Sequence, residues 1–184
     1  MNRSSFFSIC LLLVLVFVRP SALFAQKQAS SSKKQYIVSG SITQTNSYCG
    51  GARPSEEMIT RLNTPKAWAG KKLYIRNGSE NSGKKKVLRE IVADSAGHFS
   101  TKLPSGTYCI IEKEQVKRLN TEEFRKKKTE NLKLDEECLK QWWSKCYMSF
   151  EVKEADKTDL NINFHIPCFT NGIPCMKYTG PLPQ

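Results

Sequence analysis

The residues of this sequence that could take part in the most chemistry are its seven cysteines. Cys10 lies inside an apolar N-terminal run. The other six are spread over the rest of the chain: Cys49, Cys109, Cys138, Cys146, Cys168 and Cys175. Zinc sites need thiolates and imidazoles at short spacings, but the sequence has no C-x-x-C motif and only two histidines. An even number of cysteines in an exported chain instead predicts up to three disulfides.

Two of the possible pairings can be judged from their spacing. Cys146 follows Cys138 by eight residues, which in a continuous helix rising about 1.5 Å per residue separates the Cα atoms by roughly 12 Å. A disulfide needs Cα atoms within about 7 Å, so these two can bond only if the helix breaks near Ser144. Cys168 and Cys175 flank the turn-forming pair at 171–172, which favours a local disulfide closing this loop.

The two histidines, His98 and His165, are the candidate general bases. Both fall in predicted strands, and neither has an acid or a nucleophile at a fixed spacing, so a catalytic role has no support. The His-x-x-Glu and His-Glu-x-x-His motifs of metallopeptidases do not occur in the sequence. We therefore predict no catalytic residue, no metal ligand and no cofactor, and a protein that is not an enzyme.

Trp142 and Trp143 are weak candidates for binding, since adjacent indoles can form an exposed platform for a glycan or a peptide. Both belong to an apolar stripe in which Cys138 and Trp142, and Leu139 and Trp143, recur at i,i+4 of a predicted helix. This spacing favours a place in the core for at least one of them.

Short strands are the main elements that must position these residues. Met148, Phe150 and Val152 alternate with polar residues, which is typical of a strand with one buried face. Strands are predicted at 36–42, 71–76, 87–93, 98–103, 107–112, 147–153 and 160–166. Tight turns at 94–97 and 104–106 separate neighbouring strands, which favours a β-sandwich over a βαβ fold.

Three helices are predicted, and two of them have a recognisable capping residue. Ser55 precedes two glutamates and predicts a helical turn as far as Leu62. Asn120 has the same relation to a helix that ends in the lysines 126–128, whose charge complements the helix dipole. Asp135 opens a helix that runs to about Ser144. The last two helices form an insertion within the run of strands.

The N-terminus has the order of a secretory signal peptide. Asn2 and Arg3 precede an apolar run from Phe6 to Val18, and a small residue, Ala25, precedes Gln26. A membrane anchor needs roughly 20 apolar residues, so we predict cleavage after Ala25 and a mature chain that does not span a membrane. The predicted organisation is a signal peptide (1–25), a disordered linker (26–35), a β-sandwich domain (36–166) with a helical insertion at about 116–145, and a Cys- and Pro-rich tail (167–184).

The charge of the chain is strongly basic, with a formal net charge of +12 at pH 7. Such a charge permits contact with anionic surfaces. The lysines are nevertheless spread along the sequence and are not interleaved with aromatic residues, so no specific nucleic-acid partner is predicted.

The stretch from Ile37 to Ile111 resembles the transthyretin-like (prealbumin) sandwich family, whose best-known branch is the carboxypeptidase regulatory-like domain. The resemblance rests on VSGSI at 38–42, GKKLYI at 70–75, ADSAGHF at 93–99 and LPSGTY at 103–108. It implies an antiparallel sandwich of about seven strands, and it says little about function. The hydroxyisourate hydrolases of this family end in Tyr-Arg-Gly-Ser, whereas YTGP at 178–181 lacks the arginine and the serine.

Together these observations predict a mainly β, exported, non-enzymatic module, located in the periplasm, at the cell surface or outside the cell. Its partner is predicted to be an unidentified protein or glycan of the cell envelope, because loops on a rigid sandwich are common places for recognition. Two alternatives stay open. One is an unrecognised hydrolase acting on a small or acidic substrate, and the other is a structural accessory subunit of an envelope complex.

Overall fold

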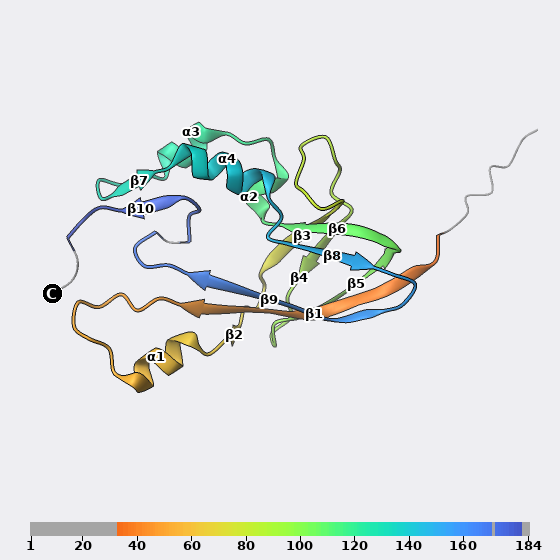
Figure 1. Cartoon of the computed structure of the whole chain (residues 1–184), viewed down its shortest axis with the longest axis horizontal. Coiled ribbons are helices and arrows are strands. Elements are labelled where there is room, and N and C mark those ends of the chain that lie inside the picture. Colours follow the sequence, from red (N-terminus) through yellow and green to blue (C-terminus); the bar gives the residue numbers. More distant parts are fainter. Residues whose placement is uncertain (1–32, 171, 182–184) are drawn as a thin grey trace, which may run out of the picture. The chain divides into compact units, whose positions relative to one another are not determined.

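A computed structural model of the chain describes residues 33–170 and 172–181 (Figure 1). The predicted signal peptide, Cys10 and most of the predicted linker lie outside the described residues. From Lys33 onward the chain forms one compact unit. Within the described part, no helix is long and apolar enough to cross a membrane.

Strands dominate the described chain, as predicted. They are β1 (Gln35–Asn46), β2 (Lys66–Ala67), β3 (Lys72–Asn77), β4 (Arg89–Val92), β5 (His98–Pro104), β6 (Gly106–Ile111), β7 (Leu132–Leu134), β8 (Met148–Val152), β9 (Lys157–Ile166) and β10 (Met176–Tyr178). The helices are α1 (Glu56–Asn63), α2 (Lys113–Val116), α3 (Thr121–Lys126) and α4 (Glu136–Ser144). The mainly β fold class is therefore confirmed.

Two four-stranded sheets form the sandwich. In the first sheet β1 pairs with β2, β5 and β9, and in the second the strand order is β4-β3-β6-β8. Their facing side chains make one apolar core, because alternate residues of each strand point to the same face. The residues of this core without any exposed surface come from both sheets: Val38, Ile42, Leu73, Ile75, Ile110 and Ile162.

One pairing departs from the expected antiparallel pattern. β9 lies beside β1 in parallel, with Ile42 opposite Ile162 and Asn46 opposite Ile166, whereas the other strand pairs are antiparallel. The strands meet so closely at Gly40 that a Cβ atom there would lie 1.9 Å from the carbonyl oxygen of Leu160. Only glycine fits this approach. Because Asn46 pairs with Ile166, β1 and β9 also end side by side.

Helices α1, α3 and α4 begin at the residues where the sequence predicts them to begin. Ser55 accepts a hydrogen bond from the amide of Met58, and Asn120 accepts one from Glu122. Asp135 accepts one from Cys138. Helices α2, α3 and α4 form the helical segment. They lie together at one end of the sandwich, with β7 and β10 beside them (Figure 1).

The C-terminal tail is more ordered than predicted. Met176–Tyr178 forms β10, which pairs antiparallel with β7, so that Met176 lies opposite Leu134 and Tyr178 opposite Leu132. The expected irregular course over the surface is wrong for this stretch. Three residues are too few for an alternating pattern to stand out in the sequence, and the strand exists because its partner comes from the helical insertion.

All six described cysteines are paired. The disulfides join Cys49 to Cys168, Cys109 to Cys146 and Cys138 to Cys175, with Cα–Cα distances of 5.4, 5.3 and 5.7 Å respectively. The predicted local bond between Cys168 and Cys175 is therefore wrong. Cys168 follows the end of β9, beside the end of β1 that leads to Cys49, while Cys175 precedes β10 and faces α4. Cys138 and Cys146 do not bond to each other, in agreement with the length of α4 between them.

A buried arginine connects the helical segment to the second sheet. Arg76 of β3 is only 3% exposed. Its guanidinium donates hydrogen bonds to the side-chain oxygen of Asn81 and to the carbonyl oxygens of Ser82 and Val116, at 2.5, 2.8 and 2.5 Å. Desolvation lowers the pKa of Arg76 from its ordinary value. These neutral acceptors fix the end of α2 against the sandwich.

The same network extends to the end of α4. The amide of Asn81 donates to the carbonyl oxygens of Gln115 and Trp143. The buried side chain of Gln115 in turn donates to the carbonyl oxygens of Trp142 and Lys145 at 2.8 Å each. Helix-terminal carbonyl groups need such partners when they are buried. The position of Trp142 is thus set by a rigid polar contact, not by the helix alone.

Candidate functional site

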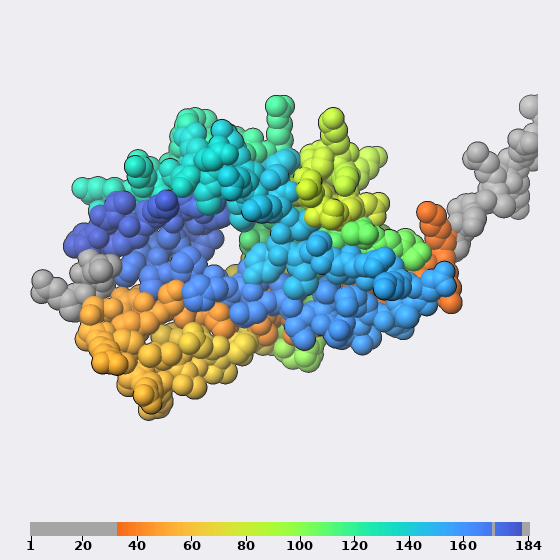
Figure 2. Space-filling model, in the orientation of Figure 1, coloured from red at the N-terminus to blue at the C-terminus, as the bar shows by residue number. Residues whose placement is uncertain are grey.

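A cleft of about 940 Å³ lies between the end of the sandwich and the helical segment. Figure 2 shows an opening through the molecule there, bordered by the ends of β1 and β9, by α4 and by the segment leading to β10. The two disulfides that end at Cys168 and Cys175 hold this segment at both of its ends. The cleft is therefore framed by covalently fixed walls.

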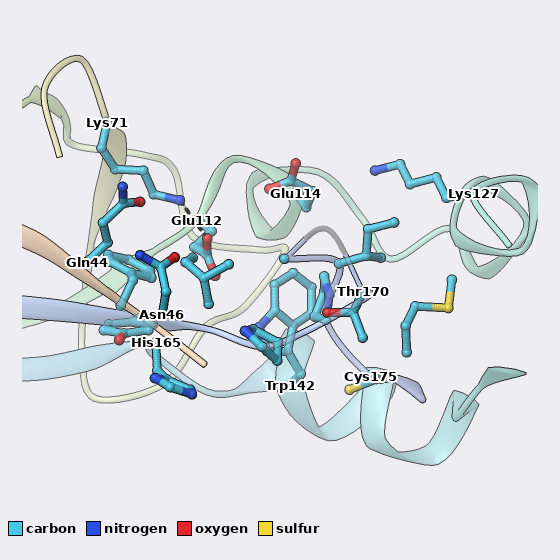
Figure 3. Close-up of a pocket in the computed structure, with 18 of the residues that line it drawn as sticks. Gln44, Asn46, Lys71, Glu112, Glu114, Lys127, Trp142, His165, Thr170 and Cys175 are labelled. Carbon is cyan, nitrogen blue, oxygen red and sulfur yellow. Dashed lines mark hydrogen bonds and ion pairs between the residues drawn. The ribbon is translucent and has the colours of Figure 1, made fainter. Parts of the chain in front are cut away.

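One end of the cleft is polar. The ammonium of Lys71 lies 2.9 Å from a carboxylate oxygen of Glu112, and their side chains are only 17% and 21% exposed. The side-chain amides of Gln44 and Asn46 lie next to this ion pair (Figure 3). Both residues belong to β1 and share the inward face of that strand with Ile42. Glu112 follows β6 as the N-cap of α2, so three neighbouring segments supply this group.

Aromatic rings surround the ion pair. The edge of Trp68 meets Phe164 at a ring-centroid distance of 5.3 Å, and Tyr147 stacks on Phe164 at 4.0 Å. The Lys71 ammonium lies 4.2 Å from the Trp68 centroid and 4.5 Å from the Phe164 centroid. Burial, and to a smaller extent the charge of Glu112, raise the pKa of Tyr147, which donates its hydroxyl to the backbone carbonyl of Asn163.

The other end of the cleft is mainly apolar. Trp142, Ile173, Pro174 and Met176 form its walls. Thr170 also lines this end and is 5% exposed. Its hydroxyl oxygen is buried and has no hydrogen-bond partner within 33–170 and 172–181. Such groups are rare, because an unpaired buried hydroxyl costs roughly 1–3 kcal/mol.

The charges that line the cleft cancel. Lys71 and Lys127 oppose Glu112 and Glu114, although the chain as a whole carries +12. Figure 3 shows Glu114 and Lys127 at the rim and Trp142 in the middle of the group. The site thus differs from the basic surface around it, and a strongly acidic ligand would gain little from it.

Comparisons with known proteins reveal one weak likeness. No protein-family model and no curated protein matches the chain. A solved structure of the major pilin subunit of Bacillus cereus aligns with 73% of this chain and 28% of the pilin chain, at 13% identity and a TM-score of 0.33. A likeness at this level gives no information about function, and the resemblance to transthyretin-like sandwiches stays a prediction.

The two predicted binding residues have different surroundings. Trp142 and Trp143 are both half-buried, and the fully buried residue of α4 is instead Leu139. Trp142 lines the cleft. Trp143 lies outside its lining and donates its indole N–H to the backbone carbonyl of Lys117 at 2.9 Å. The structure therefore does not bring the two indoles into one platform, and binding by Trp142 remains a prediction.

Sequence reasoning missed Gln44, Asn46, Lys71 and Glu112. Lys71 precedes β3 and Glu112 follows β6, and the antiparallel pairing of these two strands brings the residues together at the edge facing the end of β1. Such a pairing has no local sequence signal. The alternation of β1 could have placed Gln44 and Asn46 on the inward face, two and four residues beyond Ile42. An amide at an inward position beyond the apolar core is the one available sign of a polar cleft.

Of the two histidines, His165 lines the cleft and His98 does not. His98 is exposed on β5. The ring of His165 lies on the outer face of the first sheet, with Nε2 2.8 Å from the hydroxyl of Ser47 and Nδ1 3.3 Å from that of Thr45. A serine hydroxyl beside a histidine nitrogen is a nucleophile–base arrangement. Here the second nitrogen faces a neutral hydroxyl in place of a carboxylate, which weakens the base.

A metal centre has no counterpart in the described residues. Within them, no group of three or more histidine, cysteine, aspartate or glutamate side chains could hold a metal ion. All six cysteines there are in disulfides. What the cleft offers is recognition chemistry: two amides, a buried ion pair, aromatic rings and an aliphatic wall.

Proposed function

We propose that this chain is an exported, non-enzymatic β-sandwich module that binds a protein or glycan of the cell envelope in its cleft. The observation that carries this proposal is the cleft, which combines apolar walls with a few convergent polar groups, as ligand sites do. Its volume of about 940 Å³ lies at the upper end of the usual range for such sites. Three disulfides agree with an oxidising location outside the cytoplasm.

Rigidity of the site also favours binding over a loose structural role. The Arg76 network and the disulfides hold the cleft walls in place before a ligand arrives. A preformed site loses little conformational entropy on binding. A chain that served only as a spacer would gain nothing from such a cleft.

The proposal can be tested with two variants of the same strand. Gln44→Ala with Asn46→Ala removes both amides from the cleft, whereas Ser41→Ala with Thr43→Ala changes the opposite, outer face of β1. Immobilised protein is incubated with the protein and polysaccharide fractions of a cell envelope. We expect the inward variant alone to lose saturable retention of a ligand. Equal retention by both variants and the unchanged chain would contradict binding in the cleft.

A hydrolase remains the second candidate because of the 2.8 Å contact between Ser47 and His165. A serine activated in this way reacts with a fluorophosphonate probe. We expect no labelling, since His165 lacks a carboxylate partner among the described residues and lies on the open face of a sheet. Mass spectrometry of the treated protein locates any adduct. Labelling of Ser47 that disappears in His165→Ala would show an active serine and overturn the non-enzymatic proposal.

A further inference from the structure

We propose that the cleft ligand is an extended peptide segment with an apolar side chain. The peptide backbone binds Gln44 and Asn46, and the side chain enters the end formed by Trp142, Ile173 and Met176. This inference rests on the proposed function and names the ligand class of the same site. Four features of the cleft favour a peptide over a glycan.

The first feature is the through-going opening. Figure 2 shows an opening between the end of β9, α4 and the segment before β10, so the cleft is open on two sides. A ligand with two continuing ends can lie across such a site, and its remaining length stays outside. A closed pocket would instead favour a small molecule that is enclosed on all sides.

The second feature is that several aromatic faces are already covered. Sugar rings bind proteins by stacking on exposed aromatic faces. Tyr147 covers Phe164 at 4.0 Å, and the Lys71 ammonium lies over both Phe164 and Trp68. Trp142 remains, but its ring already has an edge-to-face contact with Phe124, and the aliphatic side chains of Ile173 and Met176 line the same cleft. This surface suits an apolar side chain better than a sugar face.

The third feature is the polar end. Each side-chain amide of Gln44 and Asn46 offers one acceptor oxygen and two donor hydrogens, the same groups that pair with a backbone peptide unit. Within the described part of the chain, neither amide is engaged in a hydrogen bond with another side chain or with the backbone. Lys71 and Glu112 neutralise each other at 2.9 Å, so the polar end matches a neutral backbone and not a charged group.

The fourth feature is the apolar end. Met176 is flexible enough to adapt to side chains of different shape. Thr170 lies beside Trp142 in Figure 3 and is only 5% exposed. Its hydroxyl has no hydrogen-bond partner among the described residues. A peptide group at this wall would give the hydroxyl a hydrogen-bond partner once the Thr170 side chain turns toward the cleft. A purely apolar cleft would have no need of a hydroxyl here.

The experiment uses the oxidised protein and two probes: a phage-displayed library of short random peptides and an oligosaccharide array. Selected peptides are added to the 15N-labelled chain, which has three tryptophans and hence three indole N–H signals. Trp68 and Trp142 line the cleft, whereas the indole of Trp143 is bonded to Lys117. We expect the Trp68 and Trp142 signals to shift and that of Trp143 to stay.

Variants give the affinity test. Trp142→Ala should weaken peptide binding by about thirtyfold, as expected for an aromatic residue at the centre of an interface. Trp143→Ala, one residue away, should change it by less than about twofold. The indole shifts of the unchanged chain test the site even if Trp142→Ala does not fold.

Three results would overturn the inference in different ways. Oligosaccharides that shift the Trp68 and Trp142 signals, with no selected peptide, would exclude a peptide ligand and leave the proposed binding function intact. Peptides that shift only Trp143 would exclude the cleft as their site. Absence of any ligand from both probes would count against the peptide inference and the proposed function together.

Discussion

Lys71 and Glu112 show how a single ion pair can organise a site. Their side chains are mostly buried at the polar end of the cleft, and the ammonium also faces two aromatic rings. A charge in such a place is costly unless its partner is present. The pair therefore fixes the rings and amides around it, and its loss should be felt beyond the two residues.

Glu112→Gln should lower the free energy of unfolding by about 2 kcal/mol, because it removes the counterion of a Lys71 side chain that is only 17% exposed. Urea denaturation measures this change. Lys71→Met combined with Glu112→Gln should recover part of the loss, since no unpaired charge then remains. A single variant as stable as the unchanged chain would show that the ion pair is solvated and does not organise the cleft.

At the scale of elements, the approach of β1 to β9 is the tightest constraint. Gly40→Ala would place a Cβ atom within 1.9 Å of a backbone oxygen, so the strands would have to separate. We expect a loss of about 3 kcal/mol in the free energy of unfolding. Ser39→Ala, the neighbouring position on the outer face, should change it by less than about 0.5 kcal/mol. Similar stabilities of both variants would contradict the parallel pairing.

The start of α4 should respond to acid. The amide of Cys138 and the ammonium of Lys177 hold the pKa of Asp135 below its ordinary value of 3.8. A lowered carboxyl pKa adds stability above its unfolded value, and this stability is lost as the pH falls through the folded value. We expect the Cys138 amide signal to shift in this acidic range while core signals stay. Asp135→Asn keeps the cap and should remove the pH dependence of that signal; an unchanged titration would contradict this assignment.

Local patterns predicted the elements that they determine alone. The alternation in β8 and β9, the caps Ser55 and Asn120 and the apolar stripe of α4 were sufficient, because each depends on neighbours in the sequence. β7 and β10 were not predictable, since three residues each carry too little periodicity and each needs the other. The cleft needs four distant segments together, and the disulfide pairing depends on the same long-range contacts.

At the scale of the molecule, one disulfide stabilises the sandwich and another stabilises the wall of the cleft. The bonds Cys109–Cys146 and Cys138–Cys175 each span 37 residues, so their effects on the entropy of the unfolded chain are nearly equal. Cys109 is fully buried in the second sheet, whereas Cys138 and Cys175 lie in the wall of the cleft. Equal loops thus have different structural consequences.

Cys138→Ser with Cys175→Ser should lower the free energy of unfolding by about 3–4 kcal/mol and weaken ligand binding, while the sandwich keeps its strands. Cys109→Ser with Cys146→Ser should cost more, since a hydroxyl replaces sulfur at a fully buried position. Thermal unfolding and the ligand assay are measured on both pairs. A greater loss of stability in the first pair would show that the cleft wall, not the sheet, limits stability.

The parallel contact between β1 and β9 has a consequence for the folding of the chain during its synthesis. The first long strand lacks one of its neighbours until residues 157–166 have been synthesised, and the covalent bond between Cys49 and Cys168 can form only then. Until then the early strands present an open hydrogen-bonding edge, which attracts other chains. A chaperone that covers this edge would protect the protein during that interval.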